Sequence, residues 1–494
     1  MKLTSKLDLR LIVMALLGGL LTANAADPAY WSWAPTPPMG WNSWDAFGSS
    51  VKEASVLANA DYMDRNLKSH GWNLVTIDIQ WYEPTAQADQ YRRGAILEMD
   101  ANGRLLPAPN RFPLTAETHS FKPIGDYLRA KGLKFGLHLM RGIPRQAVDR
   151  DNVPILGTTY TATNIVDKAH SCGWNQDMYG VDMSKPGAQE YYNSVFKLMA
   201  SWGLDFVKVD DLAGHPAEIE GIRHALDQCG RPIVLSVSMG SGPNQGAHLA
   251  TNANMWRVSF DFWDNWPALY NQFANLNGHQ PYQGPGHWPD ADMIPFGHLK
   301  TWQTNTYTKF THDEQYTVMS LWCIARSPLI MGANMPDNDE FTLSLMTNDE
   351  VIAVSQASSN NRQVYNSTNH VAWVADVAGS KDKYVALFNT SPPPPAGGGR
   401  RGRGGFGGGR RGAPDGAPTN APVVAAPATN APPANDPAAA LPAKVSIALT
   451  DISLSGSCTV RDLWTHKDLG TVNGEVSAMV NSHGAVLLRV HPQQ

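Results

Sequence analysis

Cysteine is scarce in this sequence. The 494 residues include four cysteines, Cys172, Cys229, Cys323 and Cys458. None of them lies in a C-x-x-C pair, which disfavours a structural zinc site. Four thiols in so long a chain do not make a disulfide framework. Cys323 lies in an apolar run and is predicted to be a buried free thiol.

An excess of positive charge is also absent, since the formal net charge is −5. Without a basic field the chain is not expected to bind nucleic acid. No G-x-G-x-x-G motif follows an early strand, which disfavours a dinucleotide-binding fold. No H-E-x-x-H or comparable ligand spacing occurs, so a metal-dependent lyase or hydrolase that uses His138 is a weak alternative. We therefore expect no cofactor and no metal.

Long apolar runs are missing except near the N-terminus. Residues 11–21 form a short apolar run, too short for a comfortable membrane span. The basic residues Lys2, Lys6 and Arg10 precede it, and a small-residue cleavage site, Ala-Asn-Ala, follows at residues 23–25. This arrangement predicts a signal peptide over residues 1–25, with an uncleaved anchor as the alternative. The mature protein is expected in the periplasm or outside the cell, with no membrane span.

The remaining composition is that of a folded protein, with 43% hydrophobic and 17% charged residues. Between about residues 37 and 340 one unit recurs: an amphipathic helix ends at a glycine, and a short apolar strand follows. These strands are expected at residues 73–78, 134–139, 205–210, 233–238, 255–260 and 328–331. Alternating helices and strands imply parallel pairing. We predict a (β/α)8 TIM barrel over residues 30–342, with an open doubly wound sheet as the alternative.

The pattern changes after about residue 345, where helical runs give way to short apolar strands. These strands are expected at residues 363–365, 371–377, 384–388, 445–450, 458–462 and 485–490. They predict a C-terminal antiparallel β-sandwich domain over residues 343–494. A Pro/Gly/Arg-rich stretch at residues 391–444 interrupts it and is predicted to be a disordered insertion in a hairpin. Arg/Gly-rich tracts can bind RNA, but the predicted export argues against that role.

Polar residues follow several of the predicted barrel strands. Barrel enzymes place their catalytic groups at the C-terminal ends of the strands. The polar residues at these ends are Asp78, His138, Asp210, Asp211, Ser238, Asp261 and Asp292. Two carboxylates on either side of a bound sugar are what glycoside hydrolysis needs, although an Asp after a strand also serves as a helix cap. Lys208 lies two residues before Asp210 and points to the same side, where a cation keeps the carboxylate ionised.

Several strings together carry a resemblance to a known family. Residues 37–44 (PPMGWNSW) resemble the opening strand of the melibiase-type α-galactosidases, glycoside hydrolase family 27. Residues 208–211 (KVDD) resemble the nucleophile strand of that family, and residues 256–261 (WRVSFD) resemble its acid/base segment. Residues 290–293 (DADM) and 321–331 fit the regions of the seventh and eighth strands. The ordered set covers most of residues 30–345, and the C-terminal β domain fits as well.

The resemblance implies roles for residues that match the family motifs. Asp210 would be the nucleophile and Asp261 the general acid/base. Asp78 and Lys208 would bind the region of the sugar 4-hydroxyl. Arg257 would bind near the 2-hydroxyl, where contacts strengthen in the transition state.

The resemblance assigns two further residues to the sugar pocket. Asp292 would hold an adjacent ring hydroxyl. Trp41 would wall the pocket and stack on the apolar face of the sugar, a role that Trp chemistry also favours. The alternative for Trp41 is a buried residue of the barrel interior.

Three positions depart from the family pattern. Ile79 stands where galactosidases usually have a second Asp that binds the 6-hydroxyl, and an isoleucine cannot accept that hydrogen bond. His138 stands where a Tyr is common and is otherwise expected to hydrogen-bond within the network at the strand ends. Ser238 replaces an acidic residue of many relatives, which enlarges the space near the 2-substituent and leaves open whether an N-acetyl group is tolerated.

These observations predict an exported retaining exo-glycosidase. The favoured activity is α-galactosidase, which removes terminal α-D-galactosyl residues from an oligosaccharide or polysaccharide by double displacement. The alternative is a β-L-arabinopyranosidase, because β-L-arabinopyranose has the ring stereochemistry of galactose without the carbon that Ile79 would face. A carbohydrate-binding protein without catalysis is a third interpretation, which the presence of both Asp210 and Asp261 disfavours.

Overall fold

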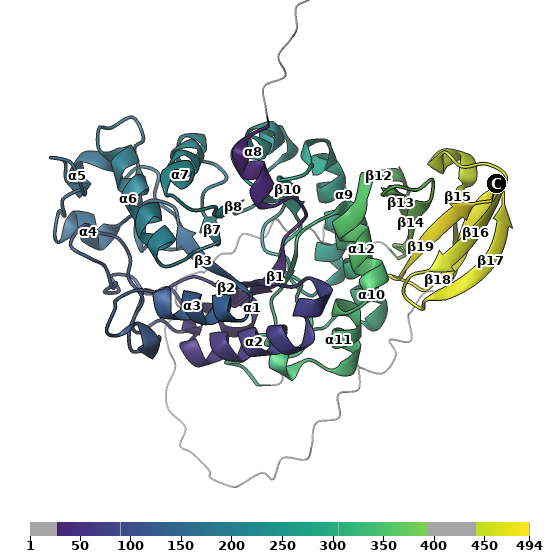
Figure 1. The fold of residues 1–494 in the computed structure, drawn as a ribbon, viewed down its shortest axis with the longest axis horizontal. Helices are drawn as coiled ribbons and strands as arrows, with labels where there is room; N and C mark the ends of the chain where they lie inside the picture. The colour runs from purple at the N-terminus through teal and green to yellow at the C-terminus, as the bar shows by residue number, and fades with distance from the viewer. Residues whose placement is uncertain (1–26, 89, 305, 393–440, 494) are drawn as a thin grey trace, which may run out of the picture.

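The computed structural model describes residues 27–88, 90–304, 306–392 and 441–493 (Figure 1). The predicted signal peptide lies outside the described residues, and so do residues 393–440 of the predicted insertion. The last two residues of that predicted insertion, Ala443 and Lys444, begin strand β15 (Ala443–Ala448) instead. Within the described ranges, no helix is long and apolar enough to cross a membrane.

Eight parallel strands form a curled sheet in the order β10-β9-β8-β7-β3-β2-β1-β11. Their bounds are β1 (Met39–Asn42), β2 (Leu74–Ile77), β3 (Lys134–Met140), β7 (Phe206–Asp210), β8 (Val234–Val237), β9 (Met255–Arg257), β10 (Trp288–Asp290) and β11 (Leu329–Met331). A parallel bridge between Ile294 and Met331 joins the segment after β10 to β11 and closes the ring. The predicted (β/α)8 barrel is confirmed.

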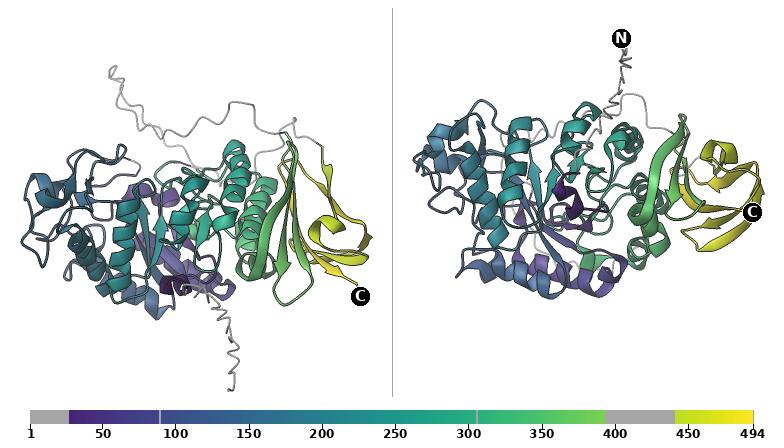
Figure 2. Two further views of the ribbon diagram at one scale, coloured as in Figure 1. Left: turned by 90° about the horizontal axis from the view of Figure 1, so that it is seen from above. Right: turned by 45° about the horizontal axis from the view of Figure 1, so that its top comes forward.

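Helices surround the sheet in the predicted alternation (Figure 2). They are α1 (Trp44–Phe47), α2 (Glu53–Asn66), α3 (Lys122–Ala130), α6 (Ala188–Ser201), α7 (Pro216–Gln228), α8 (Gly246–Ala250), α9 (Trp266–His279), α10 (His312–Ala325), α11 (Glu340–Met346) and α12 (Asp349–Ala357). In α2 the apolar residues Val56, Ala60 and Met63 recur at helical spacing and are all buried. Gly203 follows α6 at φ 85°, the left-handed conformation that lets the chain leave the helix and enter β7.

One excursion separates β3 from α6. It contains α4 (Arg145–Asp149), α5 (Ala162–Ile165) and a small antiparallel sheet of β4 (Ile143–Pro144), β5 (Val166–Asp167) and β6 (Met178–Val181). The excursion follows the C-terminal end of β3, so it lies on the same side of the barrel as the predicted catalytic residues.

The C-terminal domain is a β-sandwich of a six-stranded antiparallel sheet and a two-stranded sheet. The strands are β12 (Ser358–Asn366), β13 (His370–Val377), β14 (Lys383–Asn389), β15, β16 (Ser457–Asp462), β17 (Lys467–Asn473), β18 (Glu475–Val480) and β19 (Ala485–Pro492). Helix α10 packs against β14 and β19 and joins the domain to the barrel (Figure 1).

Two sequence expectations for this region need correction. Helix α12 extends the helical part of the chain to Ala357, past the expected domain start at residue 343, and the first strand, expected at residues 363–365, begins at Ser358. Strands β17 and β18 were not expected. β17 is exposed along most of its length, so no apolar alternation marks it. β18 alternates in burial, but it is only six residues long and its apolar Met479 lies on the exposed side.

Candidate active site

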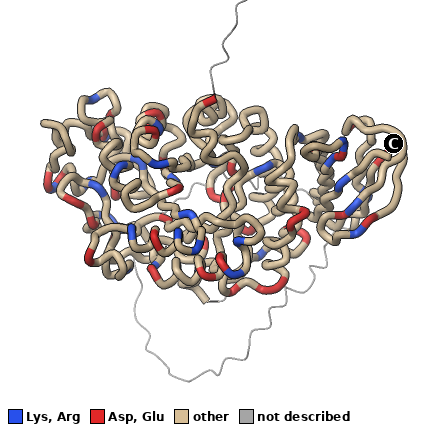
Figure 3. The backbone as a smooth tube through the Cα atoms, in the orientation of Figure 1, with Lys and Arg blue, Asp and Glu red and all other residues tan. Residues whose placement is uncertain are grey.

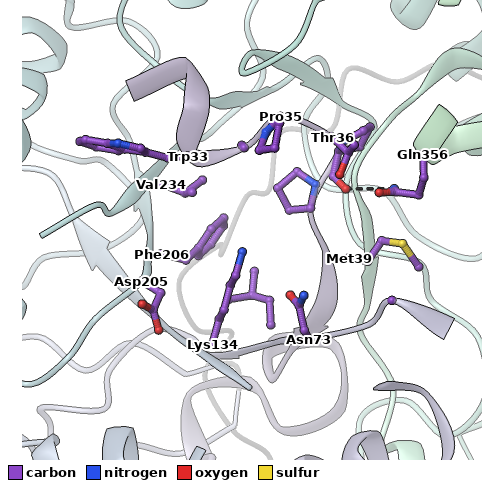
Figure 4. Close-up of a pocket in the computed structure, with 15 residues that line it drawn as sticks. Trp33, Pro35, Thr36, Met39, Asn73, Lys134, Asp205, Phe206, Val234 and Gln356 are labelled. Carbon is purple, nitrogen blue, oxygen red and sulfur yellow. Dashed lines mark hydrogen bonds between the residues drawn. The ribbon is translucent and has the colours of Figure 1, made fainter. Parts of the chain in front are cut away.

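The barrel has a cavity at each end, and the two cavities differ in size and in the residues that line them. At the N-terminal ends of the strands, a small cavity of about 150 Å³ is lined by first residues of strands such as Met39, Leu74 and Phe206 (Figure 4). Gln356 Nε2 donates a hydrogen bond to Pro37 O at its edge. Lys134 and Asp205 are the charged residues on this cavity, whereas eight charged residues line a larger cavity of about 580 Å³ at the C-terminal ends. The C-terminal ends of the strands are where barrel enzymes have their active sites.

Most of the predicted site residues line the larger cavity. They are Asp78, Ile79, Lys208, Asp210, Arg257, Asp261 and Asp292. They come from the ends of β2, β7, β9 and β10, which lie far apart in the sequence. Parallel strands bring these ends to one side of the barrel. Acidic and basic residues are interspersed along the described chain as a whole (Figure 3).

Asp210 is the last residue of β7 and lies at the floor of the cavity, with its side chain 11% exposed. Lys208 Nζ lies 3.9 Å from Asp210 Oδ1, and His138 Nε2 lies 3.0 Å from Asp210 Oδ2. Burial alone would raise the pKa of Asp210, but Lys208 and then His138 outweigh burial and hold the pKa well below its usual range. Asp210 is therefore a carboxylate, the form in which it can attack a carbon atom.

Asp78 is held beside Lys208 by three donors. Lys208 Nζ lies 3.1 Å from Asp78 Oδ2, and Asn42 Nδ2 donates to the same oxygen at 2.7 Å. The backbone N–H of Ile79 donates to Asp78 Oδ1 at 2.8 Å. Burial raises the pKa of Asp78, but the positive charges of Lys208 and His138 together with the Ile79 N–H outweigh burial, and the pKa is lowered. Asp78 and Lys208 thus form a fixed ionic pair that can exchange hydrogen bonds with a sugar hydroxyl.

Arg257 connects two carboxylates on the other side of the cavity. Its Nη2 lies 2.8 Å from Asp292 Oδ2 and 3.3 Å from Asp261 Oδ1. Asp292 is buried, and its Oδ2 also accepts from the backbone N–H of Phe262 at 2.8 Å. Burial raises the pKa of Asp292, which Arg257 only partly offsets.

Asp261 differs from Asp210 in its exposure, since its side chain is 62% exposed. It therefore lies at the mouth of the cavity, whereas Asp210 lies at the floor. A sugar between them would present one face to each carboxyl group. That is the arrangement that glycoside hydrolysis by two carboxylates requires.

Comparisons with known proteins decide the family. The family model described as Alpha galactosidase A matches residues 145–357. The model of the Alpha galactosidase C-terminal beta sandwich domain matches residues 425–490. The family 27 β-L-arabinopyranosidase of Geobacillus stearothermophilus, in complex with arabinose, is 43% identical, covers 95% of this chain and 100% of its own, and superposes with a TM-score of 0.83. This chain belongs to glycoside hydrolase family 27.

Other similar proteins differ in the activity that their names give. A Bacillus halodurans protein described provisionally as an α-N-acetylgalactosaminidase is 41% identical over 93% of this chain and 98% of its own, with a TM-score of 0.75. An α-galactosidase of Cyamopsis tetragonoloba is 25% identical over 93% of this chain and 87% of its own. The comparisons confirm the resemblance drawn from the sequence motifs, and they identify the protein as a glycoside hydrolase.

Three residues predicted to contact the substrate do not line the cavity of this family 27 enzyme, and the predictions for them are corrected. Trp41 is fully buried, and its Nε1 donates to Ala333 O at 2.7 Å. The reason is the strand pleat, because neighbouring side chains point to opposite faces and Asn42 takes the face toward Asp78. His138 and Ser238 are also fully buried. Both lower the pKa of Asp210 and so act through that carboxylate.

The motif analysis missed the aromatic wall of the cavity. Trp44, Tyr91 and Trp174 line it. The Trp44 and Tyr91 rings stack with centroids 6.0 Å apart, and those of Tyr91 and Trp174 lie 5.4 Å apart. Trp44 lies in the same PPMGWNSW string as Trp41, so the string correctly predicts a tryptophan on the cavity, but at residue 44 and not at residue 41. Tyr91 and Trp174 lie on loops, where no periodicity marks them.

The mouth of the cavity holds further residues that the sequence did not single out. They are Phe260, Trp263, Lys300 and Trp302. Asp45 also lines the cavity and is buried, which raises its pKa well above the usual range. None of these follows from spacing, because each lies outside the barrel strands.

Proposed function

We propose that this family 27 enzyme is an exported β-L-arabinopyranosidase that acts on chain ends with retention of configuration. The observation that carries the proposal is Ile79, which lines the cavity next to Asp78 and is 1% exposed. A galactose 6-hydroxyl held against this side chain would lose its water partners without replacement, at a cost of about 1–3 kcal/mol. β-L-Arabinopyranose has no such hydroxyl. The 43% identity to the Geobacillus enzyme supports the same assignment.

The proposed mechanism has two displacements. Asp210 attacks the anomeric carbon while Asp261 gives its proton to the leaving oxygen, so the glycosidic bond breaks and a covalent glycosyl ester of Asp210 forms. Asp261, now a carboxylate, takes a proton from water, whose oxygen attacks the same carbon and releases Asp210. The low pKa of Asp210 and the greater exposure of Asp261 support this division of roles.

The charged residues of the floor would bind the ring hydroxyls of the sugar through hydrogen bonds. Asp78 and Lys208 offer an acceptor and a donor to the 4-hydroxyl region. Arg257, already paired with Asp292, would reach the 2-hydroxyl, and Asp292 would hold a neighbouring hydroxyl. Because each of these groups is fixed by a partner before substrate binds, little conformational entropy is lost when the sugar enters.

An α-galactosidase is the second candidate function. The curated relatives carry that name, among them the Cellvibrio japonicus enzyme at 28% identity over 68% of this chain and 71% of its own. Galactose fits the same floor if water or another side chain satisfies the 6-hydroxyl. Both candidates share the nucleophile, the acid/base and the stereochemical outcome.

Purified protein and a panel of nitrophenyl glycosides separate the candidates. We expect kcat/KM on the β-L-arabinopyranoside to exceed that on the α-D-galactoside, and little activity on the α-D-N-acetylgalactosaminide. A galactoside preferred over the arabinopyranoside would replace the first candidate by the second. In an NMR time course, a first-formed sugar of inverted configuration would contradict the proposed mechanism for either substrate.

Export is the remaining part of the proposal. It rests on the basic start, the short apolar run and the Ala-Asn-Ala site within residues 1–25. Expression of the full chain followed by N-terminal sequencing of the protein in the periplasm and medium tests it. We expect a new N-terminus at about residue 26, and a full-length protein retained in the membrane fraction would refute cleavage.

A further inference from the structure

The cavity is larger than the sugar that the proposed function places in it. Its volume of about 580 Å³ falls in the range of pockets that bury drug-sized ligands, roughly 300–1,000 Å³. A single pentopyranose is much smaller than such a ligand. The charged residues Asp78, Lys208 and Asp210 are confined to the floor, so the sugar that is cleaved off lies there. The outer part of the cavity is left for another group.

The side chains around Asp261 give the outer part its chemistry. Phe260 precedes Asp261 directly, lines the cavity and is 53% exposed, which is unusual for a large apolar side chain. Trp263 lies two residues beyond Asp261, and Lys300 Nζ lies 4.2 Å from the centroid of its ring. Trp302 completes the group as a partly buried ring on the same cavity. Exposed aromatic side chains that gather around one opening mark a ligand groove.

The segment that carries Lys300 and Trp302 is anchored to the barrel. The backbone N–H of Lys300 donates to Asp45 O at 2.7 Å, and that of Thr301 donates to Ala46 O at 2.8 Å. Both acceptors belong to α1, whose first residue, Trp44, also lines the cavity. The rings at the mouth are therefore fixed before a ligand arrives, which lowers the entropic cost of binding.

We propose that Phe260, Trp263, Lys300 and Trp302 form a binding site for the leaving group, and that this leaving group is a second sugar ring stacked on the aromatic side chains. The inference rests on the proposed function, because Asp261 must protonate the oxygen that joins the two sugars. A sugar ring has apolar faces and polar edges. Partly exposed rings cover its faces and leave its edges in water, and Lys300 supplies a donor to a hydroxyl. A polycyclic hydrocarbon would gain most from full burial, which this open mouth does not offer.

Three substrates with the same glycone test the proposal: the glycosyl fluoride, whose leaving group has no ring, a disaccharide, and a naphthyl glycoside. For Phe260→Ala and for Trp302→Ala we expect kcat/KM on the disaccharide to fall about three- to tenfold, the usual worth of one aromatic contact. Activity on the fluoride is expected to stay within about twofold by the same reasoning. Trp302→Phe, which keeps a ring, should retain most of the disaccharide activity.

The ratio of disaccharide to fluoride kcat/KM is the deciding quantity, because the fraction of folded enzyme cancels in it. Trp266→Ala is the matched control, since Trp266 is a partly buried ring that stacks on His483, away from the cavity. Its ratio should equal that of the wild type. Equal losses on disaccharide and fluoride, or no loss on either, would overturn the proposed site. A loss on the naphthyl glycoside larger than that on the disaccharide would overturn the sugar as its occupant.

Both glycone series are measured, so that the two proposals fail separately. If the wild type prefers α-D-galactosyl substrates, the arabinopyranosidase assignment is wrong, and the same ratios in the galactosyl series still decide the leaving-group site. If the arabinopyranosyl series is preferred and the ratios do not change in the variants, the function stands and the leaving-group site is wrong.

Discussion

The two ends of the barrel are made of the same strands and differ in chemistry. On β7, Phe206, Lys208 and Asp210 alternate onto one face, from the first residue of the strand to the last. Phe206 belongs to a buried apolar cluster with Leu74, Val234 and other residues at the strand starts. Asp210 lies at the floor of the catalytic cavity, and Lys208 lies between the two. One strand therefore contributes to both the apolar core and the charged site.

The difference shows how a barrel separates stability from chemistry. At the N-terminal ends, a buried apolar cluster fills the barrel, and the small cavity there is lined by Lys134 and Asp205 together with apolar residues. At the C-terminal ends, carboxylates and cations meet in pairs, Asp78 with Lys208 and Asp292 with Arg257, so that each of these buried charges has a partner. Substitutions at the two ends should accordingly affect different quantities, and four substitutions test this.

Asp210→Asn should have the largest effect. Loss of the nucleophile is expected to lower kcat by at least about 1,000-fold. The melting temperature should change little, because Lys208 keeps Asp78 as its partner. Steady-state kinetics and thermal unfolding measure both quantities. Asp211→Asn, the same change one residue further along, is the control and should keep most of the activity; equal losses in the two variants would contradict the assignment.

Asp261→Ala should have an effect that depends on the leaving group. Removal of a general acid lowers kcat/KM by about 10²- to 10⁴-fold on glycosides whose leaving oxygen needs a proton. Fluoride leaves without such help, so hydrolysis of the glycosyl fluoride should fall much less. The comparison of kcat/KM on a disaccharide and on the fluoride checks this. A uniform loss on both substrates would mean that Asp261 only positions Arg257.

Ile79→Asp changes an apolar residue that lines the cavity next to Asp78. We expect relative kcat/KM to shift toward the galactoside by roughly 5- to 150-fold, the value of about 1–3 kcal/mol for a restored hydrogen bond. Ile79→Val is the control, because it alters size and keeps the side chain apolar. Unchanged ratios in Ile79→Asp would show that position 79 does not contact the sugar.

Phe206→Ala belongs to the opposite end and should have the smallest effect on catalysis. Truncation of a buried Phe typically lowers the free energy of unfolding by about 3–5 kcal/mol. Because Phe206 borders a cavity, we expect the lower value. Denaturant unfolding measures it, while kcat at a temperature where the protein is folded should stay within about twofold. A large fall in kcat without a loss of stability would break the separation of the two ends.

Much of the fold could be predicted from the sequence, because local signals suffice for it. Apolar spacing in α2 and a glycine in the left-handed conformation at Gly203 are properties of a few adjacent residues. The barrel followed from the repetition of such units. β17 could not be predicted in this way, because it is an exposed edge strand whose pairing with β16 supplies what its own pattern lacks.

The candidate site was predictable only in part. Asp78, Asp210 and Asp292 lie at or just beyond the C-terminal ends of strands. The location of catalytic groups in barrel enzymes and the family motifs therefore both predict them. The motif analysis placed Trp41 on the cavity and missed Trp44, because a motif gives residue types and the pleat decides which face each one takes. Phe260 and Trp302 carry no motif at all.

The amino-acid sequence alone determined the alternation of helices and strands, the family motifs and the replacement of an expected acid by Ile79, since each is written in neighbouring residues. The tertiary structure decided which side chains meet. It brought His138 of β3 to the Asp210 carboxylate of β7, buried Trp41, and collected aromatic rings from separate loops around Asp261. Such contacts depend on the closure of the barrel, which joins residues far apart in the sequence, and no local pattern contains that information.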